Sequence, residues 1–102
     1  MQKRGDSVKS QIAEIFKALS CDNRLKILEL LSKGKRCFCE ISEALNVDMS
    51  TISRHVSELS RVGLVSVRKE GKRKILSIAD ERVLKILEIA KLLGRGKYVA
   101  QA

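Results

Sequence analysis

The chain has 102 residues, of which 44% are hydrophobic and 32% charged, the composition of a single globular domain. Its net charge of +9 favours a polyanionic partner, whereas an aromatic content of only 3% argues against a protein that stacks single-stranded bases on aromatic side chains. No apolar run is long enough to span a membrane or to serve as a signal peptide, and three cysteines suit a reducing compartment, so we expect a cytoplasmic protein without a membrane partner.

Helical spacing governs the first half of the chain. Apolar residues recur every three to four positions over residues 8–19 and again over residues 22–31, which Gly34 follows as a stop signal. A short helix after residue 39 and a longer helix that Asp48 caps are separated by about three residues, as in a helix-turn-helix motif. We therefore expect such a motif over residues 39–62.

The second helix of this motif has a polar side. Taking about 100° per residue with Ile52 directed inward, the outward and flanking positions are Ser50, Thr51, Ser53, Arg54, Ser57 and Arg61. Hydroxyl and guanidinium groups donate hydrogen bonds to base edges and phosphates, so these residues are candidate DNA contacts. His55 lies nearer the buried side. For this helix taken alone, a solvated polar face explains the same pattern.

Residues 64–78 predict a β-hairpin. Val65 and Val67 are expected opposite Leu76 and Ile78, around a turn at residues 70–71. The tip is rich in candidate phosphate contacts, namely Arg68, Lys69, Lys72, Arg73 and Lys74. A cationic hairpin that directly follows a helix-turn-helix motif indicates a winged helix. The predicted fold is therefore a single domain over residues 1–102, mainly α-helical with a small β-hairpin wing.

The last predicted helix, residues 80–93, is apolar on most of its circumference. Between Val83 and Leu93 only Lys85, Glu88 and Lys91 are polar, which leaves more apolar surface than one small core covers. A second copy of the chain would bury the excess, so we expect a homodimer formed by helices 8–19 and 80–93. The candidate interface residues are Ile12, Ile15, Val83, Ile86, Leu87 and Ala90.

Residues 16–79 resemble the ArsR/SmtB family of winged-helix, metal- and metalloid-responsive repressors. The segment "FKALSCDNRLKILELL" is similar to the opening helix pair of the family, "RCFCEISEAL" to its metal-box segment, and "DMSTISRHVSELSRVGLVSVRKEGK" to its recognition helix and wing. The resemblance implies a homodimeric repressor that binds an imperfect palindrome in double-stranded DNA and is released by a thiophilic ion. It implies no obligatory cofactor, and it aligns His55 with a residue that contacts DNA or packs.

The resemblance also indicates a ligand set. Cys37 and Cys39 match the first two cysteines of the metal box, but Ser42 stands where a third would be. The last helix lacks the histidines of the zinc- and nickel-sensing branch, and residues 1–20 lack the cysteines of the cadmium- and lead-type branch. The match therefore favours arsenite or antimonite at Cys37 and Cys39, although other soft metal ions fit the same chemistry. Cys21 is a candidate third ligand.

The spacing of the two thiols sets a geometric condition. Residues i and i+2 of a regular helix diverge by about 200°, so Cys37 and Cys39 can hold one ion only if the helix start is irregular or unwinds. A helix N-terminus and the preceding cations favour thiolates, which select soft ions. Alternatives remain: two buried hydrophobic thiols, a thiol–disulfide redox switch, or a cadmium- or zinc-responsive repressor. A small thiol enzyme is a remote alternative, because neither a C-x-x-C motif nor an acid–base pair near the thiols is present.

Overall fold

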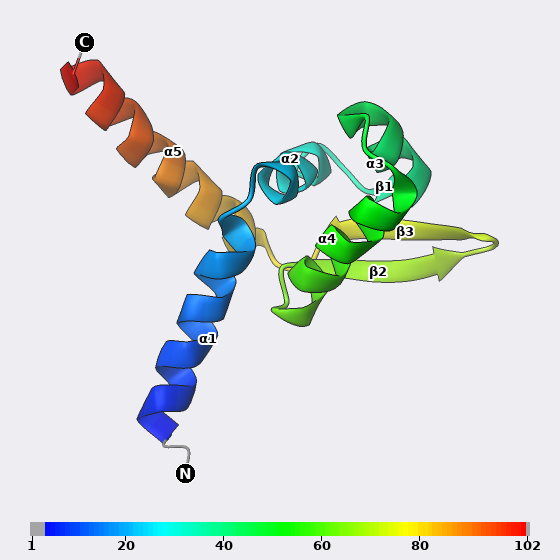
Figure 1. Ribbon diagram of the computed structural model, residues 1–102, viewed down its shortest axis with the longest axis horizontal. Helices are drawn as coiled ribbons and strands as arrows, with labels where there is room; N and C mark the ends of the chain where they lie inside the picture. The colour runs from blue at the N-terminus through cyan, green and yellow to red at the C-terminus, as the bar shows by residue number, and fades with distance from the viewer. Residues whose placement is uncertain (1–3, 102) are drawn as a thin grey trace.

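The computed structural model describes residues 4–101, with side chains over residues 8–95, and is mainly α-helical with one small antiparallel sheet (Figure 1). The elements in chain order are α1 (Arg4–Leu19), α2 (Asp22–Leu31), β1 (Arg36–Cys37), α3 (Phe38–Leu45), α4 (Met49–Arg61), β2 (Val65–Glu70), β3 (Arg73–Ile78) and α5 (Glu81–Gln101). The β2–β3 hairpin extends from one end of the molecule, whereas α1 and α5 project from the other end and diverge (Figure 1). The predicted winged helix-turn-helix fold is confirmed.

The core lies between α2, α3, α4 and the base of the hairpin. Its fully buried aliphatic side chains are Ile27, Leu28, Ile41, Ile52, Leu59 and Leu76. Each such side chain stabilises the fold by about 1.5–3 kcal/mol when it leaves water. Because α4 contributes buried residues at i, i+4 and i+7 (Ile52, Val56 and Leu59), its apolar side is held against the core and its opposite side faces outward.

The turn between α3 and α4 is defined by local hydrogen bonds. Asn46 adopts the left-handed conformation (φ 56°, ψ 48°) and ends α3. The Ser42 hydroxyl donates to the Val47 carbonyl at 2.5 Å, and Asp48 then caps α4. Ser42, which stands where the metal box of the family has a third cysteine, therefore holds the turn of the helix-turn-helix motif.

The sheet has the strand order β1–β3–β2. Val65 pairs with Ile78 and Val67 with Leu76, which is the predicted register. The loop comprises residues 71–72, one position later than predicted, and Gly71 supplies the positive φ of 65° that such a tight turn requires. Strand β1, which pairs Cys37 with Ile75 of β3, was not predicted, because a strand of two residues is too short to show alternation.

The two outer helices are longer than predicted. Helix α1 begins at Arg4, whereas periodicity indicated residue 8, and residues 1–3 and 102 lie outside the described part. Helix α5 continues past residue 93 to Gln101 and includes Gly94 and Gly96. Glycine lowers helix stability without ending a helix by itself, so the predicted stop was too early. Among the described residues, no helix combines the length and hydropathy that a membrane span needs.

Candidate DNA-binding surface and thiol site

The start of α4 carries a network of short hydrogen bonds around Asp48. Its carboxylate accepts from the Ser50 hydroxyl at 2.5 Å, the Thr51 hydroxyl at 2.8 Å and the Thr51 backbone N–H at 3.1 Å. These bonds, with that of Ser50 the largest contribution, lower the pKa of Asp48 to about 2. Because both hydroxyl protons point to Asp48, Ser50 and Thr51 offer lone pairs to an outside partner and would accept hydrogen bonds there.

The middle of α4 carries exposed side chains that are accessible to an outside partner. Ser53, Arg54 and Ser57 are exposed, and none of the three makes a side-chain hydrogen bond to another described residue. Arg54 and Ser57 lie on the side of the helix away from its buried positions, and Ser53 lies on its flank, as the periodicity predicts. A guanidinium group with free donors on an outward helix face can reach a base edge in a major groove.

Arg61, at the end of α4, has a different environment from Arg54. Its Nη2 donates to Glu14 of α1 at 2.7 Å and to Glu58 at 3.0 Å, and these two carboxylates raise its pKa. The guanidinium charge is therefore largely compensated and joins α4 to α1. The structure places Arg61 in this link, so the predicted DNA contact at this position loses support.

His55 packs against α2. Its Nδ1 lies 3.4 Å from Nη1 of Arg24, whose Nε donates to the Ala18 carbonyl at 2.6 Å. Partial burial and the nearby charges of Arg24 and Arg54 lower the pKa of His55. The half-buried ring lies on the α2 side of α4, and its lowered pKa favours the neutral form. The sequence pattern gave no sign of Arg24 in this role.

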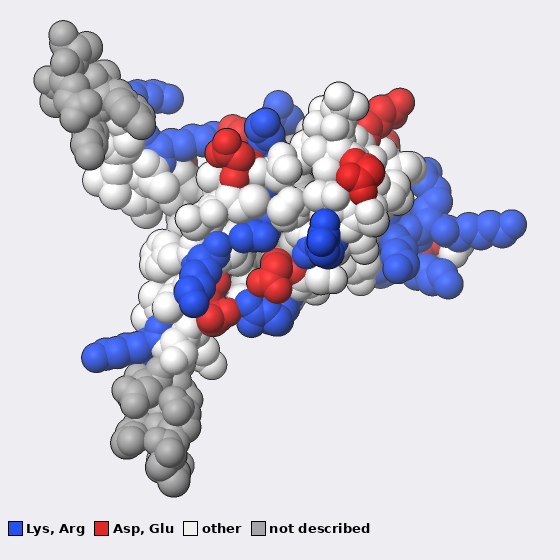
Figure 2. All heavy atoms as spheres, viewed as in Figure 1, with Lys and Arg blue, Asp and Glu red and all other residues white. Residues whose placement is uncertain are grey.

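The wing carries the predicted cations. Arg68, Lys69, Lys72, Arg73 and Lys74 are all exposed, and Lys and Arg side chains gather over the end of the hairpin (Figure 2). The one acid there, Glu70, is paired with Lys35 at 3.3 Å. The Nζ of Lys74 lies 5.9 Å from the centroid of the Phe38 ring, a cation–π distance. This surface suits a phosphate backbone.

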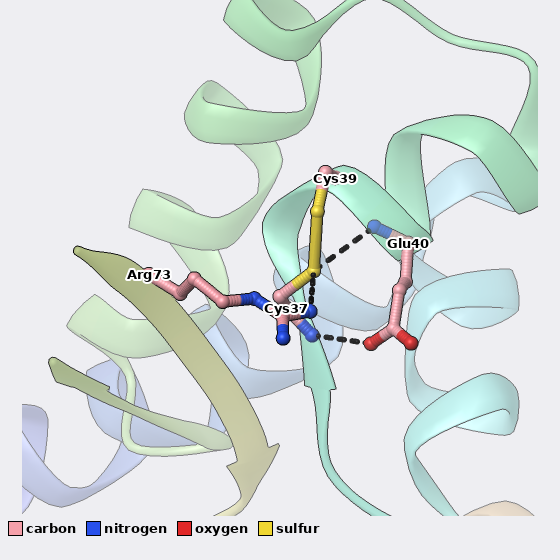
Figure 3. Close-up of a disulfide and its surroundings, with 4 residues drawn as sticks. All are labelled: Cys37, Cys39, Glu40 and Arg73. Atoms are coloured by element: carbon pink, nitrogen blue, oxygen red, sulfur yellow. Dashed lines mark hydrogen bonds between the residues drawn. A yellow bond between two sulfur atoms is a disulfide. The ribbon is translucent and has the colours of Figure 1, made fainter. Parts of the chain in front are cut away.

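The two thiols meet where α3 begins. Cys37 belongs to β1 and is the N-cap of α3, with extended backbone angles (φ −82°, ψ 161°), so the 200° divergence of a regular helix does not apply. Its Cα lies 5.4 Å from that of Cys39, and the two sulfurs are joined as a disulfide (Figure 3). Cys37 is only 1% exposed, whereas Cys39 is exposed. The irregular helix start that the pair requires is present.

The sulfur of Cys37 accepts two hydrogen bonds (Figure 3). One comes from the Glu40 backbone N–H at 3.4 Å, and the Glu40 carboxylate in turn accepts from the Cys37 N–H at 2.8 Å, which completes a capping box. The other comes from Nη2 of Arg73 in the wing at 2.9 Å. This bond ties the N-cap of α3 to the wing.

The thiols and the candidate DNA contacts line one crevice. It measures about 540 Å³, and its walls come from the start of α3, the start of α4 and the wing. The lining residues are Cys37, Phe38, Cys39, Met49, Ser50, Ser53, Lys72, Arg73 and Lys74. Phe38 and Met49 were not among the predicted site residues. Anything bound to the two sulfurs therefore lies between the helix and the wing that would hold DNA.

Among the described residues, no third ligand joins the pair. Cys21 is a free, partly exposed thiol at the N-cap of α2, and Ser42 is committed to the turn after α3. Within the described part of the chain, no three His, Cys, Asp or Glu side chains are grouped so that they could hold a metal ion. Two convergent sulfurs fit a thiophilic ion, because soft ligands select soft ions. They supply two protein ligands and leave the others open.

An exposed apolar surface covers the two projecting helices. On α1 it includes Ile12 and Phe16, with Phe16 58% exposed, and on α5 it includes Ile89, Leu92 and Leu93, with Leu93 72% exposed. Among the predicted interface residues, Ile15, Ile86 and Leu87 pack partly against the core and are less accessible. Ala90 is exposed. Val83 is 4% exposed and belongs to the core, so it offers little surface to an interface.

Comparisons with known proteins agree with this arrangement. A family model described as "Bacterial regulatory protein, arsR family" matches residues 21–67. The chain is 39% identical over 85 residues to a cadmium resistance transcriptional regulatory protein, CadC homolog, of Staphylococcus aureus, covering 82% of this chain and 70% of that protein. It is 35% identical over 71 residues to the arsenical resistance operon repressor of Staphylococcus xylosus, covering 70% of this chain and 68% of that protein.

Comparison with solved structures supports the same family. A homodimeric winged helix-turn-helix DNA-binding domain from Mycobacterium bovis, a possible ArsR-family transcriptional regulator, is similar with a TM-score of 0.88 and 31% identity over 96% of this chain and 91% of that chain. Its resemblance extends beyond the helix-turn-helix to α1 and α5. The chain is thus a member of the ArsR/SmtB family of winged-helix transcriptional repressors, a DNA-binding regulator and not an enzyme.

Proposed function

We propose that this chain is a homodimeric repressor that is released from its operator when arsenite or antimonite binds Cys37 and Cys39. One observation carries the proposal: the two sulfurs lie in the crevice between α4 and the wing, and the wing residue Arg73 donates to one of them. A ligand at the thiols would therefore act on the DNA-binding elements directly. As a DNA-binding regulator, the protein would work in the cytoplasm.

DNA binding is assigned to α4 and the wing of each protomer. Ser53, Arg54 and Ser57 would face the major groove, and the wing cations would contact phosphates. A two-fold dimer presents two such helices to successive turns of the duplex, about 34 Å apart, so the operator would be an imperfect palindrome. The homodimeric relative and the apolar faces of α1 and α5 support this assembly.

Release would follow from competition at the sulfur of Cys37. An ion that coordinates this sulfur uses the lone pairs that accept from Glu40 and Arg73 in the structure. Its binding would loosen the N-cap of α3 and the tie between α3 and the wing. Since both are adjacent to the DNA-contacting residues, ion affinity and DNA affinity become coupled, and linkage makes the coupling mutual.

The family resemblance leaves the identity of the ion open among soft ions. The relatives of this chain include a cadmium resistance regulator and an arsenical resistance repressor. Arsenite or antimonite is favoured because it needs one sulfur besides the two thiolates, whereas a four-coordinate zinc or cadmium site would need two further ligands, and the described residues group none around the pair.

A redox switch is the second candidate, because the structure joins the two sulfurs. In this mechanism the dithiol gives two electrons and two protons to an oxidant such as a peroxide, and the S–S bond forms. Release from DNA would then need an oxidant and no metalloid.

The test is a titration of reduced protein on its upstream DNA, followed by fluorescence anisotropy, with arsenite, antimonite, cadmium, zinc and a peroxide added separately. Wild-type protein should leave DNA with arsenite or antimonite. The Cys37→Ser, Cys39→Ser double variant should bind DNA and stay bound, and Cys21→Ser should behave as wild type. Release of the double variant by arsenite would show that the sensing site is elsewhere, and release of wild type by peroxide alone would favour the redox switch.

A further inference from the structure

The proposed inducer site is incomplete when only protein ligands are counted. Trivalent arsenic and antimony form three bonds to sulfur, and Cys37 and Cys39 provide two. The described residues offer no third cysteine or other grouped ligand, since Cys21 lies at the start of α2 and Ser42 is bonded to Val47. The third position is therefore open to a ligand from solution.

The crevice around the thiols has the size of a small-molecule site. Its volume of about 540 Å³ lies within the range of about 300–1,000 Å³ typical of ligand pockets. It is also cationic, because Lys72, Arg73 and Lys74 line it, and no aspartate or glutamate does. The ring of Phe38 adds an apolar wall beside Lys74. A solution ligand next to the sulfurs would thus meet positive charge on the wing side.

Resting on the function proposed above, we infer that the third ligand is a low-molecular-weight thiol that carries carboxylates, held by its sulfur on the metalloid and by its charges on Lys72 and Lys74. A third sulfur would complete the coordination of the metalloid, and an anionic group would pair with the wing cations that line the crevice. One molecule with both groups would bond to the metalloid and form ion pairs with Lys72 and Lys74, whereas water or a neutral thiol would form no such ion pairs.

The chemistry balances without an oxidant. Arsenite as As(OH)₃ reacts with the thiols of Cys37 and Cys39 and with one thiol from solution. Three As–S bonds form and three As–O bonds break, and each thiol proton leaves with a hydroxyl group as water. The protein must be in its dithiol form, so the disulfide is reduced first by exchange with two molecules of the same class of thiol, which leave joined as a disulfide.

This arrangement gives the inducer a second effect on DNA binding. Lys72 and Lys74 would serve either the phosphate backbone or the carboxylates of the bound thiol. An anion in the crevice would neutralise the wing at the place where DNA would contact it, beyond any loosening of α3. The inducing species would be the metalloid together with its thiol, and its charge would set the strength of induction.

The experiment compares three thiols on full-length, reduced and desalted protein. Mercaptosuccinate carries two carboxylates, 2-mercaptoethanol is neutral and cysteamine is cationic. Arsenite affinity is measured by equilibrium dialysis, and native mass spectrometry counts the thiols bound per site. The variants are Lys72→Gln, Lys74→Gln on the crevice side and, as the matched control, Arg68→Gln, Lys69→Gln on β2, which removes the same charge outside the crevice lining.

We expect arsenite to bind about fivefold or more tightly with mercaptosuccinate than with 2-mercaptoethanol, the size of two surface ion pairs, and one thiol to be bound per site. The preference should disappear in the crevice-side variant and persist in the β2 variant. The ratio of the arsenite affinities with mercaptosuccinate and with 2-mercaptoethanol is determined for wild type and for each variant. The affinity of free arsenite for each thiol is the same in all these measurements, so it cancels when the ratios are compared. An equal affinity with all three thiols, while arsenite still releases DNA, would overturn this inference and leave the proposed function standing. A preference that survives in the crevice-side variant would also overturn it. Absence of arsenite binding with every thiol would overturn both.

Discussion

Arg73 of the wing donates a hydrogen bond from Nη2 to the sulfur of Cys37, 2.9 Å away at the N-cap of α3 (Figure 3). The two residues lie on neighbouring antiparallel strands, because Cys37 of β1 pairs with Ile75 of β3. A cation assigned to DNA phosphate and a thiol assigned to the inducer are thus in contact. This contact would connect the proposed inducer site directly to the proposed DNA-binding surface.

The first prediction concerns this contact. Arg73→Gln should weaken binding to all duplexes, because one phosphate contact is lost, and should also reduce the coupling between arsenite and DNA. Coupling of this kind is typically about 5- to 150-fold, and in the variant it should fall toward unity. Operator affinity with and without arsenite measures it. Arg68→Gln is the matched control, since it removes a wing arginine for which no bond to sulfur is found and should retain the wild-type coupling.

Sequence periodicity was sufficient to predict the elements whose buried residues recur at a regular spacing. The alternation around Val65 and Val67 predicted the strand register, because side chains of a strand point to opposite faces in turn. The buried spacing of α4 predicted its outward face for the same kind of reason. Convergence of Cys37 and Cys39 was predicted only as a condition, since it depends on where a helix begins, and helix ends are poorly determined by periodicity.

Long-range contacts were beyond the sequence patterns. Arg61 occupies an outward position of α4 by helical geometry, but its partner Glu14 is 47 residues away on another helix. Strand β1 depends on pairing with residues of β3 that lie 38 to 40 positions later in the chain, since Arg36 pairs with Leu76 and Cys37 with Ile75, and two residues show no alternation of their own. Val83 has the apolar character of an interface residue, yet the core of the same chain buries it. Composition cannot distinguish these two fates.

The second prediction separates the two arginines of α4. Arg54→Ala should lose about 1–3 kcal/mol of preference for the operator over unrelated DNA, because an exposed guanidinium is available to read a base. Arg61→Ala should retain this preference, since Glu14 and Glu58 hold the guanidinium at the α1 side. Competition binding with operator and scrambled duplexes at one salt concentration measures both. If Arg61→Ala loses the preference and Arg54→Ala retains it, the reading face is assigned wrongly.

The third prediction concerns pH. Partial burial first, and then the charges of Arg24 and Arg54, hold the pKa of His55 below its usual 6.5. The unfolded chain therefore binds a proton at His55 at a higher pH than the folded chain does. The stability that this provides is present above pH 6.5 and is lost as the pH falls from about 6.5 toward the lowered folded-state pKa.

Urea unfolding at pH 7.5 and pH 5.5, at one protein concentration, measures this effect. Wild-type protein should lose more stability between the two values than His55→Gln, which has no titrating ring. The comparison at the same two pH values removes the contribution of carboxylates, because Asp and Glu are shared by both proteins. Equal losses would mean that the ring next to Arg24 does not titrate differently in the folded state.

The last prediction distinguishes the interface from the core on α5. Leu93 is 72% exposed and Val83 is 4% exposed, although both are apolar residues of the same helix. Leu93→Glu should place a charge on the surface that we expect a second copy to cover, so the protein should remain folded, become monomeric and lose operator affinity. Val83→Glu should instead unfold the chain, because it buries a carboxylate without a partner. Light scattering gives the mass and circular dichroism the helix content. A Leu93→Glu variant that remains dimeric would mean that this part of α5 lies outside the interface. A wild-type chain that is monomeric at micromolar concentration while it binds operator tightly would remove the dimer altogether.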